Sequence, residues 1–327
     1  MSNTSKHWAN AQERGSILGI RILLWIYRLF GRFVLSIFFA PVIFYFYLFG
    51  KTSRTASLNF LRRVEQHPEQ QTFKTEPGFW QGYWHHLNFG WIVLDKIDSW
   101  IGKLNATHVQ YADPDRVQAI MHGNKGAVFI GSHLGNIEAC RAIASSKYNK
   151  RINVLVYTHH AVAFNRILNE INPDAEIDLI QVSTLSPELM MLLRERVDQG
   201  EIVVIVGDRT PVQGPGKIKY STFLGESAPF AIGPFVLASL LECPVYLLFF
   251  MKTRHAQLRY QMILEPFADP LQLPRKKRQE ALQSWIDQYA SRLEYHTVRH
   301  PYQWFNFYDF WAKDCQTERS SLPRQQS

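Results

Sequence analysis

The feature that most constrains this chain is an uncharged apolar run near its N-terminus. From Phe33 to Phe49 the sequence reads FVLSIFFAPVIFYFYLF, seventeen residues without a charged side chain. A transmembrane helix needs roughly 17–25 such residues, so this run lies at the lower limit for crossing a bilayer. Pro41 lies within the run and predicts a kink there. The segment therefore belongs either in a lipid bilayer or in a buried helical pair of a soluble domain.

The residues before this run favour the membrane. Ile17 to Phe30 is apolar but contains Arg21 and Arg28, which lie on nearly the same face of a helix. That pattern is typical of a helix lying on a membrane with its arginines at lipid phosphates. Basic residues flank both sides of the apolar run, so the positive-inside rule favours a hairpin or monotopic helix over one clean crossing. A cleaved signal peptide fits poorly, because the apolar segment is long, aromatic and preceded by a long charged region.

The net charge of +8 has the same origin. The first 63 residues carry nine basic side chains and one acidic one, and the rest of the chain is balanced. The excess charge therefore predicts contact with an anionic lipid surface and not with nucleic acid. Three cysteines cannot build a disulfide framework, and nothing later in the chain looks built for an oxidising compartment. We expect the protein at the cytoplasmic leaflet of a membrane.

The body of the chain alternates apolar strands with helices of about ten residues. Residues 51–110 read as helical, and six strands are expected after Pro114: 126–132, 151–158, 177–182, 201–207, 245–251 and 258–264. Helices between continuous apolar strands predict an α/β fold with a mostly parallel central sheet flanked by helices. We expect a membrane-anchoring helical segment over 1–50, an α/β domain over 51–315 and a polar tail over 316–327.

Polar residues follow three of these strands, at the sheet edge where parallel sheets bind ligands. His133 comes directly after the first strand, and Glu138 lies in the first turn of the next helix. A histidine is a suitable general base near neutral pH, and a carboxylate partner fixes its tautomer. The two side chains meet only if His133 lies in a loop that folds back, which the glycines around it permit.

Two further clusters are expected at the same edge. His160 and Asn165 follow the second strand, and Asp208 and Arg209 follow the strand EIVVIVG. The sequence has no G-x-S-x-G elbow, so a serine acyl-enzyme is not indicated. Direct attack on a thioester needs only a base, an oxyanion donor and a slot for the acyl chain.

Four blocks in this order resemble a known group. They are HxxxxE at 133–138, GDR at 207–209, FLG at 223–225 continuing into A-x-F-x-x-G-P-F, and PYQWFNFY at 301–308. Together they resemble the lysophospholipid acyltransferase superfamily, and within it the lipid A lauroyl/myristoyl acyltransferases and their predicted relatives. The resemblance covers roughly residues 15 to 311.

The resemblance implies roles for individual residues. His133 would remove a proton from an acceptor hydroxyl as it attacks an acyl thioester, while Glu138 orients and charge-balances the imidazole. Asp208 and Arg209 match the second block and are expected to bind substrate, with Arg209 at an acceptor phosphate or the developing oxyanion. We expect His160 and Asn165 at the mouth of the same site, as substrate-binding residues.

The implied partners are membrane lipids and an acyl thioester of acyl carrier protein or coenzyme A, with no other cofactor and no metal. The basic run Arg275 to Arg278 is a candidate docking site for the acidic carrier protein. The acceptor stays open among lipid A precursors, phospholipids, amino-acid lipids and aryl-polyene lipids.

Two other functions fit an anchored α/β domain. A monotopic glycosyltransferase would need a glycine-rich nucleotide-phosphate loop, and we see no convincing one. A non-catalytic lipid-binding protein on the same scaffold would not need His133. A zinc hydrolase is disfavoured because the pairs His85-His86 and His159-His160 are adjacent and not spaced i, i+4.

Overall fold

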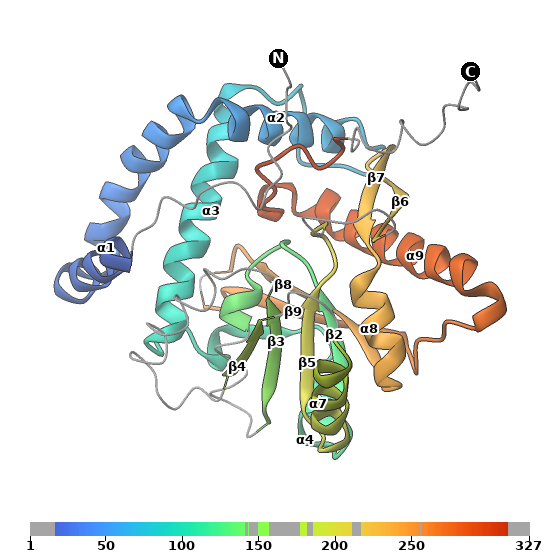
Figure 1. The fold of residues 1–327 in the computed structure, drawn as a ribbon. Coiled ribbons are helices and arrows are strands. Elements are labelled where there is room, and N and C mark those ends of the chain that lie inside the picture. Colours follow the sequence, from blue (N-terminus) through green and yellow to red (C-terminus); the bar gives the residue numbers. More distant parts are fainter. Residues whose placement is uncertain are drawn as a thin grey trace, which may run out of the picture.

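The computed structural model describes residues 17–140, 143, 150–156, 177–181, 186–210, 217–255 and 257–312. It is an α/β domain with a layer of long N-terminal helices along one side (Figure 1). The predicted fold class is confirmed.

The central sheet has seven strands in the order β1-β9-β8-β2-β5-β3-β4. Only the β8–β9 pair of this sheet is antiparallel, and the other five neighbouring pairs are parallel. The strands are β1 (Val109–Tyr111), β2 (Ala127–Gly131), β3 (Ile152–Val156), β4 (Ile177–Gln181), β5 (Ile202–Val206), β8 (Val245–Lys252) and β9 (Tyr260–Ala268). Every residue of β2 is buried, as its unbroken apolar sequence predicts.

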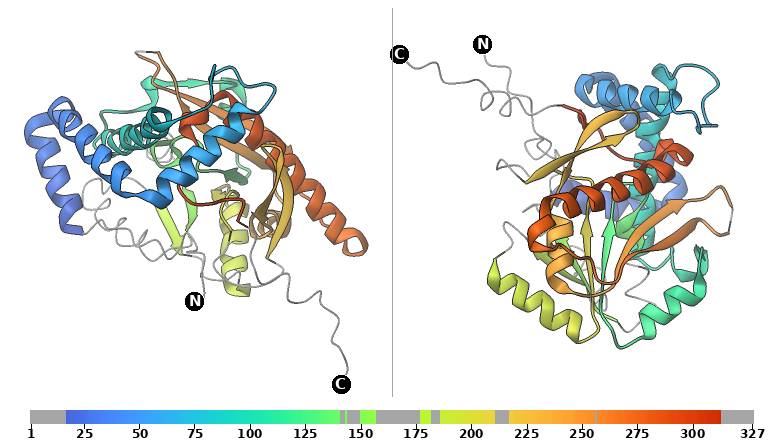
Figure 2. Two further views of the ribbon diagram at one scale, coloured as in Figure 1. Left: turned by 90° about the horizontal axis from the view of Figure 1, so that it is seen from above. Right: turned by 90° about the vertical axis from the view of Figure 1, so that its right-hand side faces the viewer.

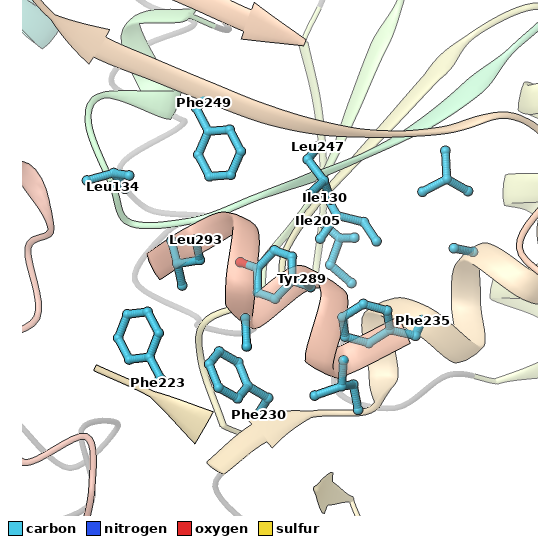
Figure 3. Packing of buried hydrophobic residues seen from close by; sticks show 14 of the residues in the cluster. Ile130, Leu134, Ile205, Phe223, Phe230, Phe235, Leu247, Phe249, Tyr289 and Leu293 are labelled. Carbon is cyan, nitrogen blue, oxygen red and sulfur yellow. The ribbon is translucent and has the colours of Figure 1, made fainter. Parts of the chain in front are cut away.

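Helices cover both faces of this sheet. One face packs against α7 (Pro187–Asp198), α8 (Gly233–Leu241) and α9 (Arg278–Arg299), and the other against α4 (Pro114–His122) and the helical residues 137–140. The right-hand view of Figure 2 shows α7 and α8 on one side of the sheet and α4 on the other. In Figure 3, Tyr289 and Leu293 of α9 face the buried strand residues Ile130 and Leu247.

Three strands of the structure were not predicted. The short strand β1 lies where the sequence reads as helical, because three residues carry no measurable periodicity. The strands β6 (Ile218–Phe223) and β7 (Glu226–Ala231) form a separate antiparallel hairpin. Its turn is made by Leu224 and Gly225, both with positive φ (52° and 79°), as tight hairpin turns require. The FLG block is therefore a hairpin turn.

Three long helices form the N-terminal layer: α1 (Ile17–Phe49), α2 (Lys51–Glu65) and α3 (Phe79–Trp100). The break in α1 lies at Gly31 (φ 75°, ψ 179°), where the arginine-containing part meets the apolar run, and Pro41 lies inside the helix. The kink predicted at Pro41 is thus found at Gly31, whose missing side chain permits this φ. Among the described residues, Leu29–Phe49 is the segment long and apolar enough to cross a membrane, with a mean hydropathy of 1.9.

A buried ion cluster ties α1 to the rest of the molecule. Asp95 of α3 is fully buried, and its carboxylate lies 2.7 Å from Arg32 of α1 and 2.8 Å from Lys252 at the end of β8. Arg259 pairs with the same carboxylate, and Tyr260 donates to it at 2.8 Å. These cations lower the pKa of Asp95 against the opposing effect of its burial.

We predict that Asp95→Asn destabilises the protein strongly. Removing this charge leaves three partly buried cations short of a partner, which should lower the free energy of unfolding by about 3–5 kcal/mol. Denaturant unfolding of the detergent-solubilised protein measures this loss. Asp198→Asn is the control, because Asp198 forms an exposed pair with Arg194 and should cost at most about 1 kcal/mol. Equal losses in the two variants would contradict the prediction.

Candidate active site

The candidate site lies where β2 and β5 end. These strands are adjacent and parallel, and Gly131 pairs with Val206 at their ends. His133 lies two residues after Gly131 and Asp208 two residues after Val206, so the two residues leave the sheet side by side. The loop after β2 is held on both sides, since Gly135 N donates to the Gln303 carbonyl and Asn136 N to that of Phe250. Gly135 has φ +82°, and a Cβ there would lie 2.0 Å from the Phe250 oxygen. Only glycine therefore fits this turn.

Asp208 is the hydrogen-bond partner of His133. The ring Nδ1 of His133 lies 2.8 Å from Oδ1 of Asp208, and the His133 backbone N–H donates to Oδ2 at 2.8 Å. The indole N–H of Trp304 donates to the same Oδ2 at 3.0 Å. Burial raises the pKa of Asp208, but His133 and Arg209 outweigh it and lower the pKa to about 2. The carboxylate is therefore ionised at neutral pH.

This carboxylate fixes the tautomer of His133. Because an ionised carboxylate only accepts hydrogen bonds, Nδ1 carries the proton and Nε2 carries the lone pair. Nε of Arg209 lies 3.3 Å from Nε2 and donates to it. Burial, helped by Arg209, lowers the pKa of His133, while Asp208 opposes this shift. The imidazole is thus neutral near pH 7, with the proton-accepting nitrogen directed away from Asp208.

Arg209 is held in place by the closing aromatic segment. Its guanidinium donates to Oδ1 of Asn306 at 2.9 Å and to the Phe305 carbonyl at 3.1 Å. The same group lies 4.9 Å from the centre of the Tyr308 ring. Two charged donors and a cation–π contact fix the guanidinium beside the base.

The closing segment thus supplies residues that the sequence did not assign. Trp304 is fully buried and bonds Asp208, and the Phe305 N–H donates to the His133 carbonyl at 3.1 Å. The resemblance included this segment as a block, but a contact across 96 residues of chain has no local signal. The burial of Trp304 in the core is therefore also what brings its indole N–H to Asp208.

Glu138 does not hold the imidazole as predicted. Its Oε2 lies 3.9 Å from Nζ of Lys96 in α3, while the Nδ1 proton of His133 goes to Asp208. Strand adjacency explains the difference, because β2 and β5 deliver His133 and Asp208 to the same point. Glu138 still acts on the imidazole through space, since its negative charge raises the pKa of His133.

Glu138 also borders an apolar cavity of about 40 Å³ between the sheet and the helical residues after 136. The other walls are apolar except for Tyr111. They are Val109, Tyr111, Val117, Met121, Phe129, Ile137, Cys140, Ile143, Ile152, Val154, Val204, Leu248, Phe250 and Met262. The cavity therefore places an apolar space next to Glu138.

Other predicted residues have different outcomes. His160 and Asn165 lie outside the described residues, so their roles stay predictions. The basic run Arg275–Arg278 lies at the start of α9, whose 22 residues extend about 33 Å before the chain returns to Trp304. The docking role of this run for the carrier protein stays a prediction.

His85 is a structural histidine. Its Nε2 donates to the Trp304 carbonyl at 2.9 Å, and its Nδ1 accepts from the Ser57 hydroxyl at 2.8 Å. Burial lowers its pKa to about 3, so the ring is neutral. In the part of the chain that the structure describes, no group of three or more His, Cys, Asp or Glu side chains is placed to hold a metal.

Comparison with known families agrees with this geometry. The model of the bacterial lipid A biosynthesis acyltransferases matches residues 1–313. The chain belongs to this family. It is therefore an acyltransferase that acts on a lipid acceptor, which confirms the resemblance and disfavours the glycosyltransferase alternative. Among curated proteins, none matches the chain.

We predict that Trp304→Phe impairs catalysis by this acyltransferase beyond its effect on stability. Phenylalanine keeps an aromatic ring but removes the N–H that holds Asp208, which should cost about 1–3 kcal/mol of stability. We expect kcat to fall about tenfold, which corresponds to ~1.4 kcal/mol of transition-state stabilisation, and the pH profile to shift. Steady-state kinetics across pH measures both effects.

Trp311→Phe is the matched control. Trp311 is also buried and also donates its indole N–H, but to the Phe223 carbonyl at 3.2 Å. It should lose similar stability while keeping the pH profile of the unaltered enzyme. The positioning role of Trp304 is refuted if the two variants have the same kinetics at equal folded fraction.

Proposed function

We propose that this enzyme moves a fatty acyl group from a thioester of acyl carrier protein or coenzyme A to a hydroxyl or amine of a membrane lipid, with His133 as general base. The observation that carries the proposal is a neutral imidazole whose tautomer, with the lone pair on Nε2, is fixed by a buried, ionised Asp208 at Nδ1. Such a base accepts a proton without a covalent acyl-enzyme.

The reaction proceeds in two proton transfers. Nε2 of His133 takes the proton of the acceptor group as its oxygen or nitrogen attacks the thioester carbonyl carbon. The carbon–sulfur bond then breaks, and the imidazolium returns its proton to the leaving thiolate. Asp208 stabilises the imidazolium in between, and the more distant charge of Glu138 adds to this stabilisation.

Arg209 is assigned to the oxyanion of the tetrahedral intermediate. Its Nε–H occupies Nε2 of His133 in the free enzyme, so the acceptor group must displace this contact when it binds. Asn306 and the Phe305 carbonyl keep the guanidinium nearby after displacement. The oxyanion forms on the carbon that the acceptor atom attacks, within reach of these charged donors.

The apolar cavity beside Glu138 is assigned to the acyl chain. At about 40 Å³ it is narrow, so entry of a chain requires neighbouring side chains to move apart. Met121 and Met262 line it, and methionine side chains adapt to new shapes more readily than branched ones. His160 and Asn165 stay assigned to substrate binding at the mouth.

Membrane association places the enzyme at its acceptor. The apolar part of α1 exposes most of its surface, which suits contact with lipid. We assign it to the cytoplasmic face of a bacterial inner membrane, because acyl thioesters are cytoplasmic donors. The acceptor then needs to move only within the bilayer.

We predict that His133→Ala lowers kcat by at least about 10²-fold, because the proton acceptor is lost. Free-thiol release from acyl-coenzyme A or acyl carrier protein, in the presence of a bacterial lipid extract, measures this loss. His255→Ala, at an exposed histidine in the β8–β9 turn, should keep full activity. Retained biological activity of His133→Ala would instead favour a non-catalytic lipid-binding role.

The pH dependence of activity tests whether Asp208 raises or lowers the pKa of His133. Activity of the unaltered enzyme should fall only below about pH 6.5, the usual pKa of histidine, because the pKa of His133 is lowered. Asp208 raises that pKa, so Asp208→Asn should move the acid limb of kcat/KM to still lower pH while reducing kcat. An acid limb that moves to higher pH would contradict the assigned interaction.

Cys140→Leu should narrow the cavity and shift donor preference toward shorter acyl chains. Competition between thioesters of different chain length, analysed by lipid mass spectrometry, measures the shift. Cys243→Leu is the matched control, since Cys243 is equally buried but packs on the opposite face of the sheet. Each variant should cost about 1–3 kcal/mol of stability through overpacking. Only Cys140→Leu should change the preferred acyl-chain length of the donor. An equal change in both variants would exclude this cavity as the site of the acyl chain.

A further inference from the structure

We propose that α1 does not cross the bilayer but lies in its plane, and that α3 joins it in one lipid-binding face. This inference rests on the membrane association proposed above and adds the orientation of the enzyme on the membrane. It also adds a second helix, α3, to the surface in contact with lipid.

The first observation is that α1 packs antiparallel on α3 along nearly its whole apolar length. At one end the Tyr47 ring lies 5.1 Å from that of Phe79, and further along the Tyr83 hydroxyl donates to the Ala40 carbonyl at 3.1 Å. Near the other end, Leu35 shares a buried cluster with residues of α3, and the Arg32 pair with Asp95 closes the contact.

Two glycines of α3 make this contact close. A Cβ at Gly82 would lie 2.5 Å from the Tyr47 hydroxyl oxygen, and one at Gly90 would lie 2.0 Å from Cδ1 of Ile43. Small residues at these positions let the two helices approach as they do in membrane helix pairs. The α1–α3 pair therefore behaves as one unit.

The other side of α3 is bound to the catalytic body. His85 donates to the Trp304 carbonyl, Asn136 donates to the Ile92 carbonyl at 3.3 Å, and Asp95 pairs with Lys252. Figure 1 shows α3 between α1 and the sheet. A crossing α1 would thus carry α3 and this charged edge of the sheet into the hydrocarbon, where charges are costly.

The exposed side of α1 is a continuous uncharged stripe that recurs at helical spacing. After the break at Gly31 its members are Phe33, Ile37, Phe38, Val42, Tyr45, Phe46 and Phe49, and Leu48 beside them is also exposed. A stripe along the full length of one side is what a helix lying in the plane presents to lipid.

The apolar surface continues onto α3. Trp80 and Trp84 are 62% and 52% exposed, although tryptophan is a costly residue to leave in water. The Trp80 ring lies 5.3 Å from that of Phe79, which contacts Phe44 of α1 at 6.2 Å. Tryptophan is enriched at the membrane–water interface, so we assign both side chains to the headgroup level.

Positive charge at the end of the stripe also fits a lipid bilayer. Lys51 is exposed two residues after Phe49, and the Arg54 guanidinium donates to the Tyr47 and Leu48 carbonyls at 2.9 and 2.6 Å. Cations in this position complement anionic lipid phosphates. An apolar contact with a second copy of this chain would not require cations at the end of the stripe.

Depth-dependent quenching tests the proposal on the full chain. Single reporters are Phe33→Cys, Val42→Cys and Phe49→Cys along α1, Trp84→Cys on α3 and Met191→Cys on α7, each labelled with a fluorophore. Cys140 and Cys243 are buried, and Cys315→Ser removes the remaining thiol. Vesicles of phosphatidylethanolamine and phosphatidylglycerol carry bromine at two acyl-chain depths.

We expect the reporters at the three α1 positions to lie at equal, shallow depths. The reporter at position 84 of α3 should also be quenched. The reporter at position 191 of α7 should not be, because the Met191 side chain is 75% exposed and lies away from the proposed lipid-binding face. A profile with position 42 at the bilayer centre and positions 33 and 49 near opposite headgroups would overturn the in-plane orientation. If the reporter at position 84 is not quenched, α3 is not part of the lipid-binding face. Absence of quenching at every position, with a dimer in solution, would assign the face to a second copy.

The same measurement on His133→Ala separates this proposal from the proposed reaction. The depth profile of that variant should match the others whether or not His133 is the base. A wrong orientation and a wrong mechanism therefore give different results.

Discussion

The site depends on one buried carboxylate. Asp208 accepts from the His133 ring, from the His133 backbone and from the Trp304 indole, and these donors come from two segments far apart in the chain. Without them the cost of burying the charge would keep the carboxyl protonated. With them the group is ionised and fixes both the tautomer and the orientation of the His133 ring.

Packing of α9 provides the frame for this carboxylate. The Tyr289 hydroxyl donates to the Gly131 carbonyl at 2.9 Å, and its ring fills the space where a Cβ at Gly207 would lie. The glycine before Asp208 is therefore required by the approach of α9 to the ends of β2 and β5. A second charged centre, around Asp95, lies at the same sheet edge and is linked to it, since Asn136 donates to the Tyr260 hydroxyl at 3.3 Å. The loop that carries His133 and helix α1 thus share one hydrogen-bonded framework.

Much of the fold follows from local sequence. The strands β2, β3, β4, β5 and β8 are apolar runs bounded by polar or turn residues, and they were predicted within one or two residues. The hairpin β6–β7 and the three-residue β1 were not, because their stability comes from partners elsewhere: β6 packs against α9 and β1 pairs with β9. His133, Asp208 and Arg209 were identified as candidates from their position after strands. The hydrogen bond between the first two was not identified.

The sequence by itself determined an apolar aromatic arm, a mostly parallel sheet and a histidine at its carboxyl edge, because periodicity and composition encode these locally. Only the tertiary structure decided which acid serves that histidine. Glu138 is five residues away and Asp208 is 75, yet β2 and β5 are adjacent strands, so the distant carboxylate arrives at Nδ1. Trp304 and Asn306 join the site in the same way. Strand order in a sheet is set by the packing of the whole domain, and no single stretch of sequence contains it.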